Sequence, residues 1–290
     1  MSSLKKQINS LLDHKFWKKG ENICTQYFKA CELCDEIYNK GMVLMQVGSF
    51  FEAYGVNNKY IQRGHANLIG DIFNIAVTRK GKKKYAEELG NRKIEDLTKK
   101  QLIKLHEKYP LMSGMNELVI EKYLRIAIEN GYTVVLIEQL EQPTKGMMVR
   151  RGVTKIVSPG TFIETSSKDK NNIASIFIEK VMKKKQPYFC IGLSLIDATT
   201  GENIIFEVFD KKTDNNYALD ETIRFILSNT TSEILINTKN IDMTENDLLS
   251  RLQLYNHKLV NIKLDKLPSD FYKINFQERF LKKIFPDTGL

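Results

Sequence analysis

The chain has 290 residues, of which 42% are hydrophobic and 27% charged, and its formal net charge is +9 at pH 7. This composition excludes collagen-like and disordered chains, and no apolar run reaches the roughly 20 residues of a membrane-spanning helix. Four cysteines are too few for a disulfide framework, so we expect an intracellular, reducing compartment, with cytoplasm, nucleus and organelle all open. The positive charge leaves nucleic acid, an acidic surface or an anionic membrane as partners.

The first half of the chain predicts helices that alternate with short apolar strands. Apolar residues at helical spacing, followed by glycine stops, indicate helices over 22–39, 57–68 and 116–130. Short apolar runs indicate extended segments at 42–47, 50–54, 74–78, 133–140 and 147–158. The helix at 116–130 leads directly into the buried strand at 133–140, which is the order of an α/β unit.

A second unit follows a polar stretch at residues 164–172, the best candidate for a linker. The pattern then predicts three strands followed by helix, strand, helix and strand, at 173–181, 188–197, 203–209, 216–228, 232–238, 243–254 and 258–264. This order is typical of a mixed sheet, so the predicted fold class is α/β with mixed α and β elements. We divide the chain into residues 1–163, 164–267 and 268–290, the last of which begins a further unit.

Positive charge is concentrated in residues 79–108, which carry 11 basic and 5 acidic side chains. The excess of six equals the whole excess of residues 1–145, which carry 23 basic and 17 acidic side chains. One interpretation is an arm that faces phosphates, because lysine and arginine near a duplex release counterions. The other is a lysine-rich loop that is merely solvated.

The most unusual local feature is GSFFEAYG at residues 48–55, where two aromatic residues and a carboxylate lie between glycines. Side chains alternate across a strand, so Phe50 and Glu52 face one way and Phe51 the other. One face then presents an aromatic wedge beside a hydrogen-bond acceptor, while Phe51 anchors the core. Periodicity alone favours the other interpretation, two core aromatics and an acid placed there by chance.

GSFFEAYG resembles the mismatch-recognition motif of the MutS family of DNA mismatch repair proteins, usually written G-D-F-Y-E. Other blocks resemble segments of the same family in the same order: NIAVTRKG (74–81), YLRIAIENGYTVVLIEQLEQP (123–143), KGMMVRRGVTKIVSPGT (145–161) and LSLIDATTGE (193–202). Together these blocks are highly specific, although each alone is weak. The resemblance implies a MutS-like mismatch-recognition domain over 1–163, a ribonuclease-H-like connector domain over 164–267 and the start of a core or lever domain over 268–290.

The resemblance also implies roles for single residues. Phe50 matches the phenylalanine that enters the minor groove and stacks on a mispaired base, and Glu52 matches the glutamate that hydrogen-bonds the same base. The physical chemistry fits, because a mispaired step is cheap to unstack and an apolar wedge there kinks the duplex. Basic residues would position phosphates, and PLMSGMNE (110–117) loosely resembles a family loop that contacts the groove. The predicted DNA-binding residues are Phe50, Glu52, Thr78, Arg79, Lys80, Lys82, Lys83, Lys84, Met112 and Ser113.

The chain departs from the family pattern in three places. Ser49 and Phe51 replace the usual aspartate and tyrosine, and the segment between Gly81 and Pro110 is longer and more basic than usual. A G-x-x-x-x-G-K-[ST] phosphate loop is absent from the printed sequence. The complete family protein is implied to be a DNA-dependent ATPase that binds ATP and magnesium in a domain outside this sequence. We therefore expect a natural truncation, a split gene or an excised fragment, with no cofactor, no catalytic residues and no turnover.

The expected partner is double-stranded DNA with mispairs or small loops, and the resemblance implies a homodimer or heterodimer for the full-length protein. It also implies contacts with repair proteins through the connector domain, and no membrane is expected. The alternative function is a protein-interaction adaptor whose DNA binding is weak or vestigial. A third class, an enzyme, would use Asp197 with Glu202, Glu207 or Asp210 as metal-binding carboxylates.

One further cluster raises the question of a metal. Cys24, Cys31 and Cys34 fall on one helical face, and His14 would have to supply a fourth zinc ligand. A reduced and buried helix face explains the same spacing, and we predict no metal site.

Overall fold

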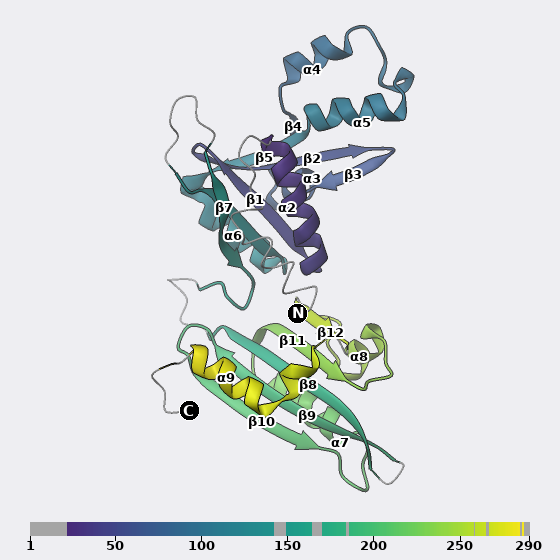
Figure 1. Cartoon of the computed structure of the whole chain (residues 1–290), viewed down its shortest axis with the longest axis vertical. Helices are drawn as coiled ribbons and strands as arrows, with labels where there is room; N and C mark the ends of the chain where they lie inside the picture. Colours follow the sequence, from purple (N-terminus) through teal and green to yellow (C-terminus); the bar gives the residue numbers. More distant parts are fainter. Residues whose placement is uncertain are drawn as a thin grey trace. The chain divides into compact units, whose positions relative to one another are not determined.

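The computed structural model describes residues 22–141, 149–163, 170–183, 186–257, 259–264, 267–284 and 286. They form two compact units, one ending at Phe162 and the other beginning at Ile163 (Figure 1). Each unit combines helices with a sheet of parallel and antiparallel pairs, which confirms the predicted fold class. No helix in these ranges is long and apolar enough to cross a membrane.

The first unit is built on a seven-stranded sheet in the order β4-β5-β2-β1-β6-β7, with β3 paired to β2. The central pair β1 and β6 is parallel, and the other pairs are antiparallel. The strands are β1 (Gly41–Val47), β2 (Phe50–Asn58), β3 (Ile61–Gly64), β4 (Thr78–Arg79), β5 (Leu111–Asn116), β6 (Thr133–Gln139) and β7 (Arg151–Val157).

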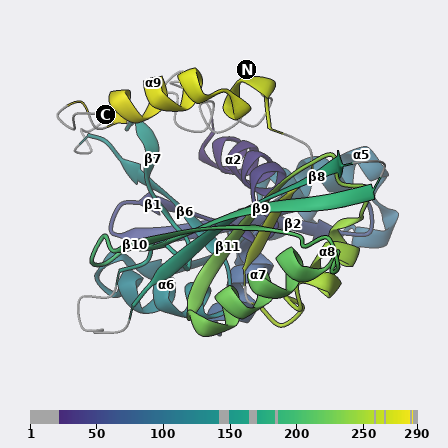
Figure 2. The same ribbon diagram turned by 90° about the horizontal axis from the view of Figure 1, so that it is seen from below.

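Helices cover both faces of this sheet. Helix α2 (Ile23–Ile37) lies on the face opposite α6 (Ile120–Glu129), and α3 (Ala66–Phe73) packs against α6 and β5 (Figure 2). The Asn22 side chain caps α2 by accepting a hydrogen bond from the Cys24 amide at 2.8 Å. With both faces covered, β1 and β6 are buried over most of their length, as their continuous apolar sequences predict.

The basic segment between β4 and β5 folds into two helices, α4 (Lys82–Leu89) and α5 (Lys99–Lys108), joined through the short helix η2 (Ile94–Asp96). We call residues 82–108 the α4–α5 hairpin. Its core consists of the buried Leu97, Leu102 and Leu105. The expectation of a merely solvated loop was therefore wrong, because leucines three residues apart on α5 give one face to bury. That this segment faces phosphates stays a prediction.

Two other expectations in the first unit need correction. The helix predicted over 57–68 is instead the β2–β3 turn, β3 and the start of α3. The Asn58 side chain accepts hydrogen bonds from the Tyr60 and Ile61 amides, which closes the turn. The strand predicted over 74–78 is reduced to β4, because Asn74 takes a left-handed conformation (φ 51°) that ends α3.

The second unit holds a five-stranded sheet in the order β10-β9-β8-β11-β12. The predicted order of elements is confirmed, with ends shifted by a few residues. The elements are β8 (Asn172–Lys183), β9 (Gln186–Asp197), β10 (Asn203–Phe209), α7 (Tyr217–Ser228), β11 (Thr231–Lys239), α8 (Glu245–Arg251) and β12 (Val260–Lys263).

Beyond residue 268 the chain forms η4 (Ser269–Tyr272) and α9 (Ile274–Ile284). The Tyr272 ring contacts Phe177 of β8 at 5.7 Å between centroids, and the Lys239 ammonium lies 4.8 Å from the same ring. Most of the expected linker at 164–172 lies outside the described residues.

Candidate nucleic-acid interface

The aromatic pair sits where the β1–β2 turn delivers the chain into β2. Gly48 takes a positive φ of 62° in that turn, and the register pairs Phe50 with Val47 of β1 and Asn116 of β5. Phe50 is 47% exposed, whereas Phe51 is 3% exposed within the main core. The alternation expected from the sequence is therefore present, with one ring in solvent directly beside one in the core.

Glu52 lies on the same face of β2 as Phe50 and belongs to a hydrogen-bonded network. Its Oε2 accepts a short hydrogen bond from the Tyr54 hydroxyl, and that hydroxyl accepts one from Lys80 Nζ at 2.8 Å. Lys80 Nζ is 3.7 Å from Glu52 Oε2 and 4.3 Å from the centre of the Tyr54 ring. The carboxylate is thus oriented by a tyrosine and partly balanced by a cation.

Burial raises the pKa of Tyr54, and the hydrogen bond to Glu52 raises it further. Tyr54 therefore stays protonated and acts as the donor to Glu52. The Arg151 guanidinium is a second cation that interacts electrostatically with Tyr54 and Glu52. Burial lowers the pKa of Arg151, and these two groups act in the opposite direction. Sequence reasoning missed Tyr54 and Arg151. The i, i+2 spacing of Glu52 and Tyr54 could have revealed their shared face, whereas the approach of Lys80 and Arg151 depends on tertiary structure.

Gly114 of β5 lies directly opposite Glu52 in the register. A Cβ atom there would stand 3.0 Å from the Phe51 carbonyl oxygen and 3.4 Å from Glu52 Cγ. A side chain would crowd both the β2 backbone and the carboxylate. The glycine therefore leaves the surface over Glu52 open. We call Phe50, Glu52, Lys80 and Gly114 the Phe50 surface.

The remaining predicted residues fall into two groups, packed and exposed. Arg79 is packed, because it donates to the Tyr109 carbonyl oxygen at 2.7 Å and lies 4.4 Å from the Tyr85 ring centre, and burial lowers its pKa. Thr78 is exposed and pairs with Met112 across β4 and β5. Exposed lysines open α4, namely Lys82, Lys83 and Lys84.

The two residues predicted in the 110–117 block differ in exposure. Ser113 is 1% exposed, and its hydroxyl donates to the Ala66 carbonyl oxygen at 3.1 Å. Its side chain therefore fastens β5 to α3 and is not available to DNA in this conformation. Met112 is half-buried and packs against the main core. The burial of Ser113 has a physical reason, since only a sheet register distinguishes which face of β5 each side chain occupies. Met112 stays a prediction.

Two of the four carboxylates considered for a nuclease, Asp197 and Asp210, are engaged in structural contacts. Asp197 accepts from the Thr199 amide, and from the Thr200 hydroxyl at 2.7 Å, and hydrogen bonds from Thr199 hold the pKa of its carboxyl well below the usual range. Asp210 accepts from the Phe189 and Ala218 amides.

Metal ligands do not converge in the part of the chain that the structure describes. No group of three or more His, Cys, Asp or Glu side chains there could hold an ion. Cys24, Cys31 and Cys34 are buried, and burial raises the pKa of each thiol. His14 lies outside the described residues.

Comparisons with known proteins point to one family. The sequence profile of MutS domain I matches residues 85–166. A mutS homolog of Acanthamoeba polyphaga mimivirus is 30% identical over 286 residues, which cover 92% of this chain and 23% of that protein. DNA mismatch repair protein MutS of Methanosarcina barkeri is 30% identical over 194 residues (64% of this chain, 18% of that protein). The Streptococcus thermophilus protein of the same name is 29% identical over 136 residues (45% and 15%).

The fold and the site define a two-unit α+β protein whose first unit carries a half-exposed aromatic residue beside an oriented carboxylate. By sequence, the chain is similar to proteins of the MutS family, and residues 85–166 match the family's domain I. It spans about a quarter of the length of the mimivirus relative and less of the other two.

Proposed function

We propose that the chain serves DNA mismatch repair by binding duplexes at mispairs or small loops, with Phe50 as a wedge between bases. The observation that carries this proposal is the contrast between Phe50, 47% exposed, and Phe51, 3% exposed. The buried neighbour fixes the strand that presents the exposed ring. A mispaired step costs less to unstack than a paired one, so a rigid wedge discriminates through deformation and not through sequence. The names of the relatives support this role.

Glu52 would accept a hydrogen bond from the edge of the base beside Phe50. The Tyr54 hydroxyl already binds Oε2, so the other carboxylate oxygen is the one assigned to the base. A lone carboxylate near backbone phosphates would be repelled. Lys80 at 3.7 Å reduces that repulsion, which makes an acidic group tolerable at a DNA surface.

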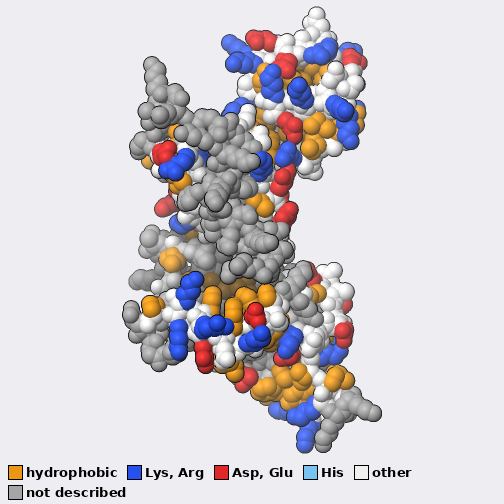
Figure 3. All heavy atoms as spheres, viewed as in Figure 1, with side chains coloured by type: hydrophobic (Ala, Val, Ile, Leu, Met, Phe, Trp, Pro, Cys, Tyr) orange, Lys and Arg blue, Asp and Glu red, His pale blue; other side chains and the backbone are white. Residues whose placement is uncertain are grey.

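The α4–α5 hairpin would contribute binding affinity that does not depend on the mispair. Lysine and arginine side chains gather on it (Figure 3), and Lys82, Lys83 and Lys84 are exposed at its start. The hairpin leaves the sheet at β4, which pairs with β5, the strand that also borders Phe50. Contacts to phosphates beside the mispair follow from this connection. We assign binding and no turnover to this chain, because both oxygens of Asp197 and of Asp210 already accept hydrogen bonds from protein donors.

The test measures fluorescence anisotropy with matched and mispaired duplexes of otherwise identical sequence. Phe50→Ala should abolish the preference for the mispaired duplex and leave affinity for the matched duplex nearly unchanged. The matched control is Phe209→Ala, which removes a ring of similar exposure (43%) from the other unit and should change neither affinity. Equal weakening for both duplexes in Phe50→Ala would contradict the wedge.

The electrostatic part is tested by the salt dependence of matched-duplex affinity. Lys83→Ala/Lys84→Ala should reduce the slope of log K against log salt by about 0.9 for each phosphate that is no longer neutralised. Lys282→Ala/Lys283→Ala is the control, because it removes two adjacent, exposed lysines from helix α9. Identical slopes for the two variants would show that charge alone, and not the hairpin, governs binding.

A second candidate function is a protein-interaction adaptor, and the free edge of β10 favours it. This strand ends the second sheet, and its Ile204, Ile205 and Phe209 are 48%, 81% and 43% exposed. An exposed apolar edge strand can pair with an extended segment of a partner. Ile205→Lys should abolish capture of such a partner without changing DNA affinity. A chain with no measurable DNA affinity at low salt would favour the adaptor.

A further inference from the structure

The turn between β2 and β3 carries a basic and aromatic surface that none of the roles assigned above uses. Lys59 and Tyr60 form this turn, and Tyr60 is 40% exposed. The Lys59 ammonium lies 4.9 Å from the centre of the Tyr60 ring. The ammonium of Lys99, the first residue of α5, lies 5.8 Å from the same ring, where the turn meets the α4–α5 hairpin (Figure 1). We call Lys59, Tyr60 and Lys99 the Tyr60 surface.

The backbone that carries the Tyr60 surface is fixed by one side chain. Asn58 Oδ1 accepts from the Tyr60 and Ile61 amides at 2.9 and 3.2 Å, which closes the turn. Asn58 Nδ2 lies 3.1 Å from His106 Nδ1 of α5, which joins the turn to the helix that begins with Lys99. The two segments that supply the lysines are therefore positioned before any ligand arrives, and less ordering is lost on binding.

The lysines of the Tyr60 surface carry charge that the protein itself does not balance. Both are exposed, and neither pairs with an acidic side chain of the described ranges. Two acids of the α4–α5 hairpin are engaged elsewhere, Glu107 with Arg63 at 2.9 Å and Glu88 with Lys108 at 2.6 Å. Unpaired ammonium groups attract phosphates, and a tyrosine hydroxyl can donate to a phosphate oxygen. The chemistry of this surface suits the sugar–phosphate backbone of DNA.

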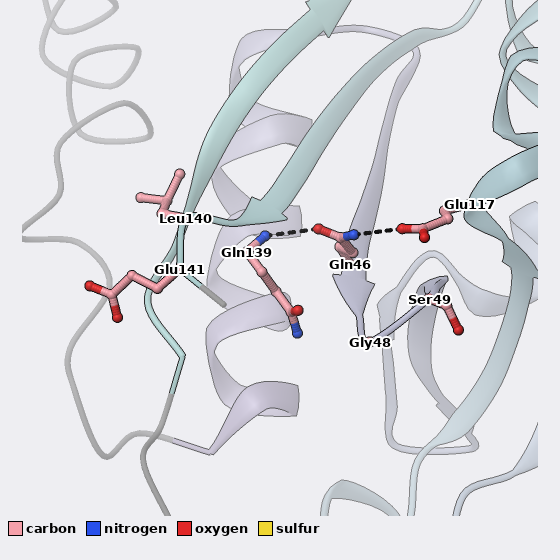
Figure 4. Close-up of a pocket in the computed structure, with 7 residues that line it drawn as sticks. All are labelled: Gln46, Gly48, Ser49, Glu117, Gln139, Leu140 and Glu141. Carbon is pink, nitrogen blue, oxygen red and sulfur yellow. Dashed lines mark hydrogen bonds between the residues drawn. The ribbon is translucent and has the colours of Figure 1, made fainter. Parts of the chain in front are cut away.

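The opposite end of β2 offers phosphates no comparable partner. A pocket of about 410 Å³ lies there beside the β1–β2 turn, and the charged residues among those that line it are Glu117 and Glu141 (Figure 4). Glu117 accepts from the neutral Gln46 side chain at 2.8 Å. Two nearby cations are already engaged, Arg150 with Glu141 and Arg151 with the Gln46 carbonyl oxygen at 3.1 Å. Among the described residues, phosphates are therefore attracted to one end of β2 and not to the other.

The length of β2 sets the distance between the proposed wedge and the Tyr60 surface. The strand has nine residues, from Phe50 to Asn58. At roughly 3.3 Å per residue the two ends lie roughly 26 Å apart. At about 3.4 Å per base pair, this span corresponds to about eight base pairs of duplex. A duplex arm that leaves the wedge along β2 would therefore pass the Tyr60 surface at that distance from the mispair.

We propose that the Tyr60 surface is a second DNA contact, which binds the sugar–phosphate backbone of one duplex arm about eight base pairs from the mispair. The inference rests on the proposed function and adds a direction to it, since the duplex extends from Phe50 along β2. The contact adds affinity without adding preference for the mispair, because it touches phosphates and sugars only. One long arm is sufficient, because the β1–β2 end has no equivalent surface.

The experiment measures fluorescence anisotropy with duplexes that carry a central T·T mispair and two equal arms of about 6, about 10 or about 14 base pairs. A T·T mispair is the same from either strand, so both directions of binding are equivalent. Wild-type affinity should rise about tenfold between the shortest and the middle duplex, because only the longer arms reach the Tyr60 surface. Lys59→Ala/Lys99→Ala should abolish this rise and leave the preference for mispaired over matched duplex unchanged.

The matched control is Lys40→Ala/Lys122→Ala, which removes two exposed lysines that also lie beside tyrosine rings of the first unit, at 5.8 and 5.6 Å. This variant should keep the dependence on arm length. Shortening one arm alone should lower wild-type affinity only about twofold, since one of two equivalent directions is lost. A loss as large as that from shortening both arms would contradict the single direction.

Two further outcomes separate this inference from the proposed function. The same rise with arm length in Lys59→Ala/Lys99→Ala and in the control would overturn the Tyr60 surface and leave the wedge intact. A wild-type chain that binds mispaired and matched duplexes equally would contradict the proposed function, and the inference with it.

Discussion

The Phe50 surface and the α4–α5 hairpin belong to the same unit but are supported in different ways. The Phe50 surface grows out of β2, which is hydrogen-bonded on both sides and anchored by the buried Phe51. The hairpin has a core of three buried leucines and joins the sheet through side chains: Arg63 with Glu107 at 2.9 Å, and Asn58 with His106 at 3.1 Å. The proposed wedge thus lies on a rigid element, whereas the proposed phosphate contacts lie on an element with a small core of its own.

The largest effect should come from removing the anchor of the rigid element. Phe51→Ala should lower the free energy of unfolding of the first unit by about 3–5 kcal/mol, because it empties a fully buried ring site. Phe50→Ala should change it by less than about 0.5 kcal/mol. Urea unfolding of both variants measures the difference, and similar destabilisation by the two would show that the rings share one environment.

An intermediate and local effect should come from the hairpin core. Leu102, 1% exposed, is one of three buried leucines, so Leu102→Ala should destabilise the hairpin by about 2–4 kcal/mol. Amide hydrogen exchange should then accelerate in α4 and α5 and remain slow in β1. Ile94→Ala in η2, where the side chain is 45% exposed, is the control. Faster exchange throughout the sheet would mean that hairpin and sheet unfold as one.

The smallest effect concerns pH at the junction between the two elements. Burial lowers the pKa of His106, and the positive charge of Arg79 lowers it further. The folded state therefore binds the proton less readily than the unfolded state. The stabilisation is fully present above the unfolded pKa of about 6.5 and decreases as pH falls through the folded value.

The hydrogen bond between Asn58 and His106 also predicts that the folded state favours the unprotonated histidine. Asn58 Nδ2 is 3.1 Å from His106 Nδ1, and an amide nitrogen donates only, so that ring nitrogen must be unprotonated. The protection factors of the α5 amides, which remove the intrinsic pH dependence of exchange, should decrease modestly between about pH 7 and about pH 5.5, on either side of the ordinary histidine pKa. His106→Gln should remove the pH dependence, and a pH response that persists in this variant would assign it to another group.

Sequence periodicity predicted the buried strands well. β1, β6, β8 and β9 are largely apolar runs whose burial follows from their composition, and only their ends shifted. Strand alternation predicted that Phe50 and Phe51 lie on opposite faces, one exposed and one buried. The α4–α5 hairpin was missed because lysines dominate the composition of the segment. The three leucines that form its core are too few to give a clear helical pattern.

The side-chain contacts of the site could be predicted less well than the strand β2 that carries Phe50 and Glu52. Lys80 reaches Tyr54 across 26 residues of sequence, and Gln46 reaches Gln139 across 93. Neither contact has a local pattern, since both arise when separate strands meet in one register. Ser113 shows the converse, because resemblance to a family loop gave the position but not the face of the strand.

The β1–β2 turn determines which of the two phenylalanines is exposed and which is buried. Phe50 and Phe51 are chemically identical, and only the pairing of Phe50 with Val47 and Phe51 with Gln46 assigns one to solvent and the other to the core. A shift of the register by one residue exchanges the faces of a whole strand. Lengthening the turn after Gly48 by one residue could therefore swap the two rings without altering either. The length of the turn, and not the aromatic residue itself, thus decides which of the two rings is exposed and could act as the proposed wedge.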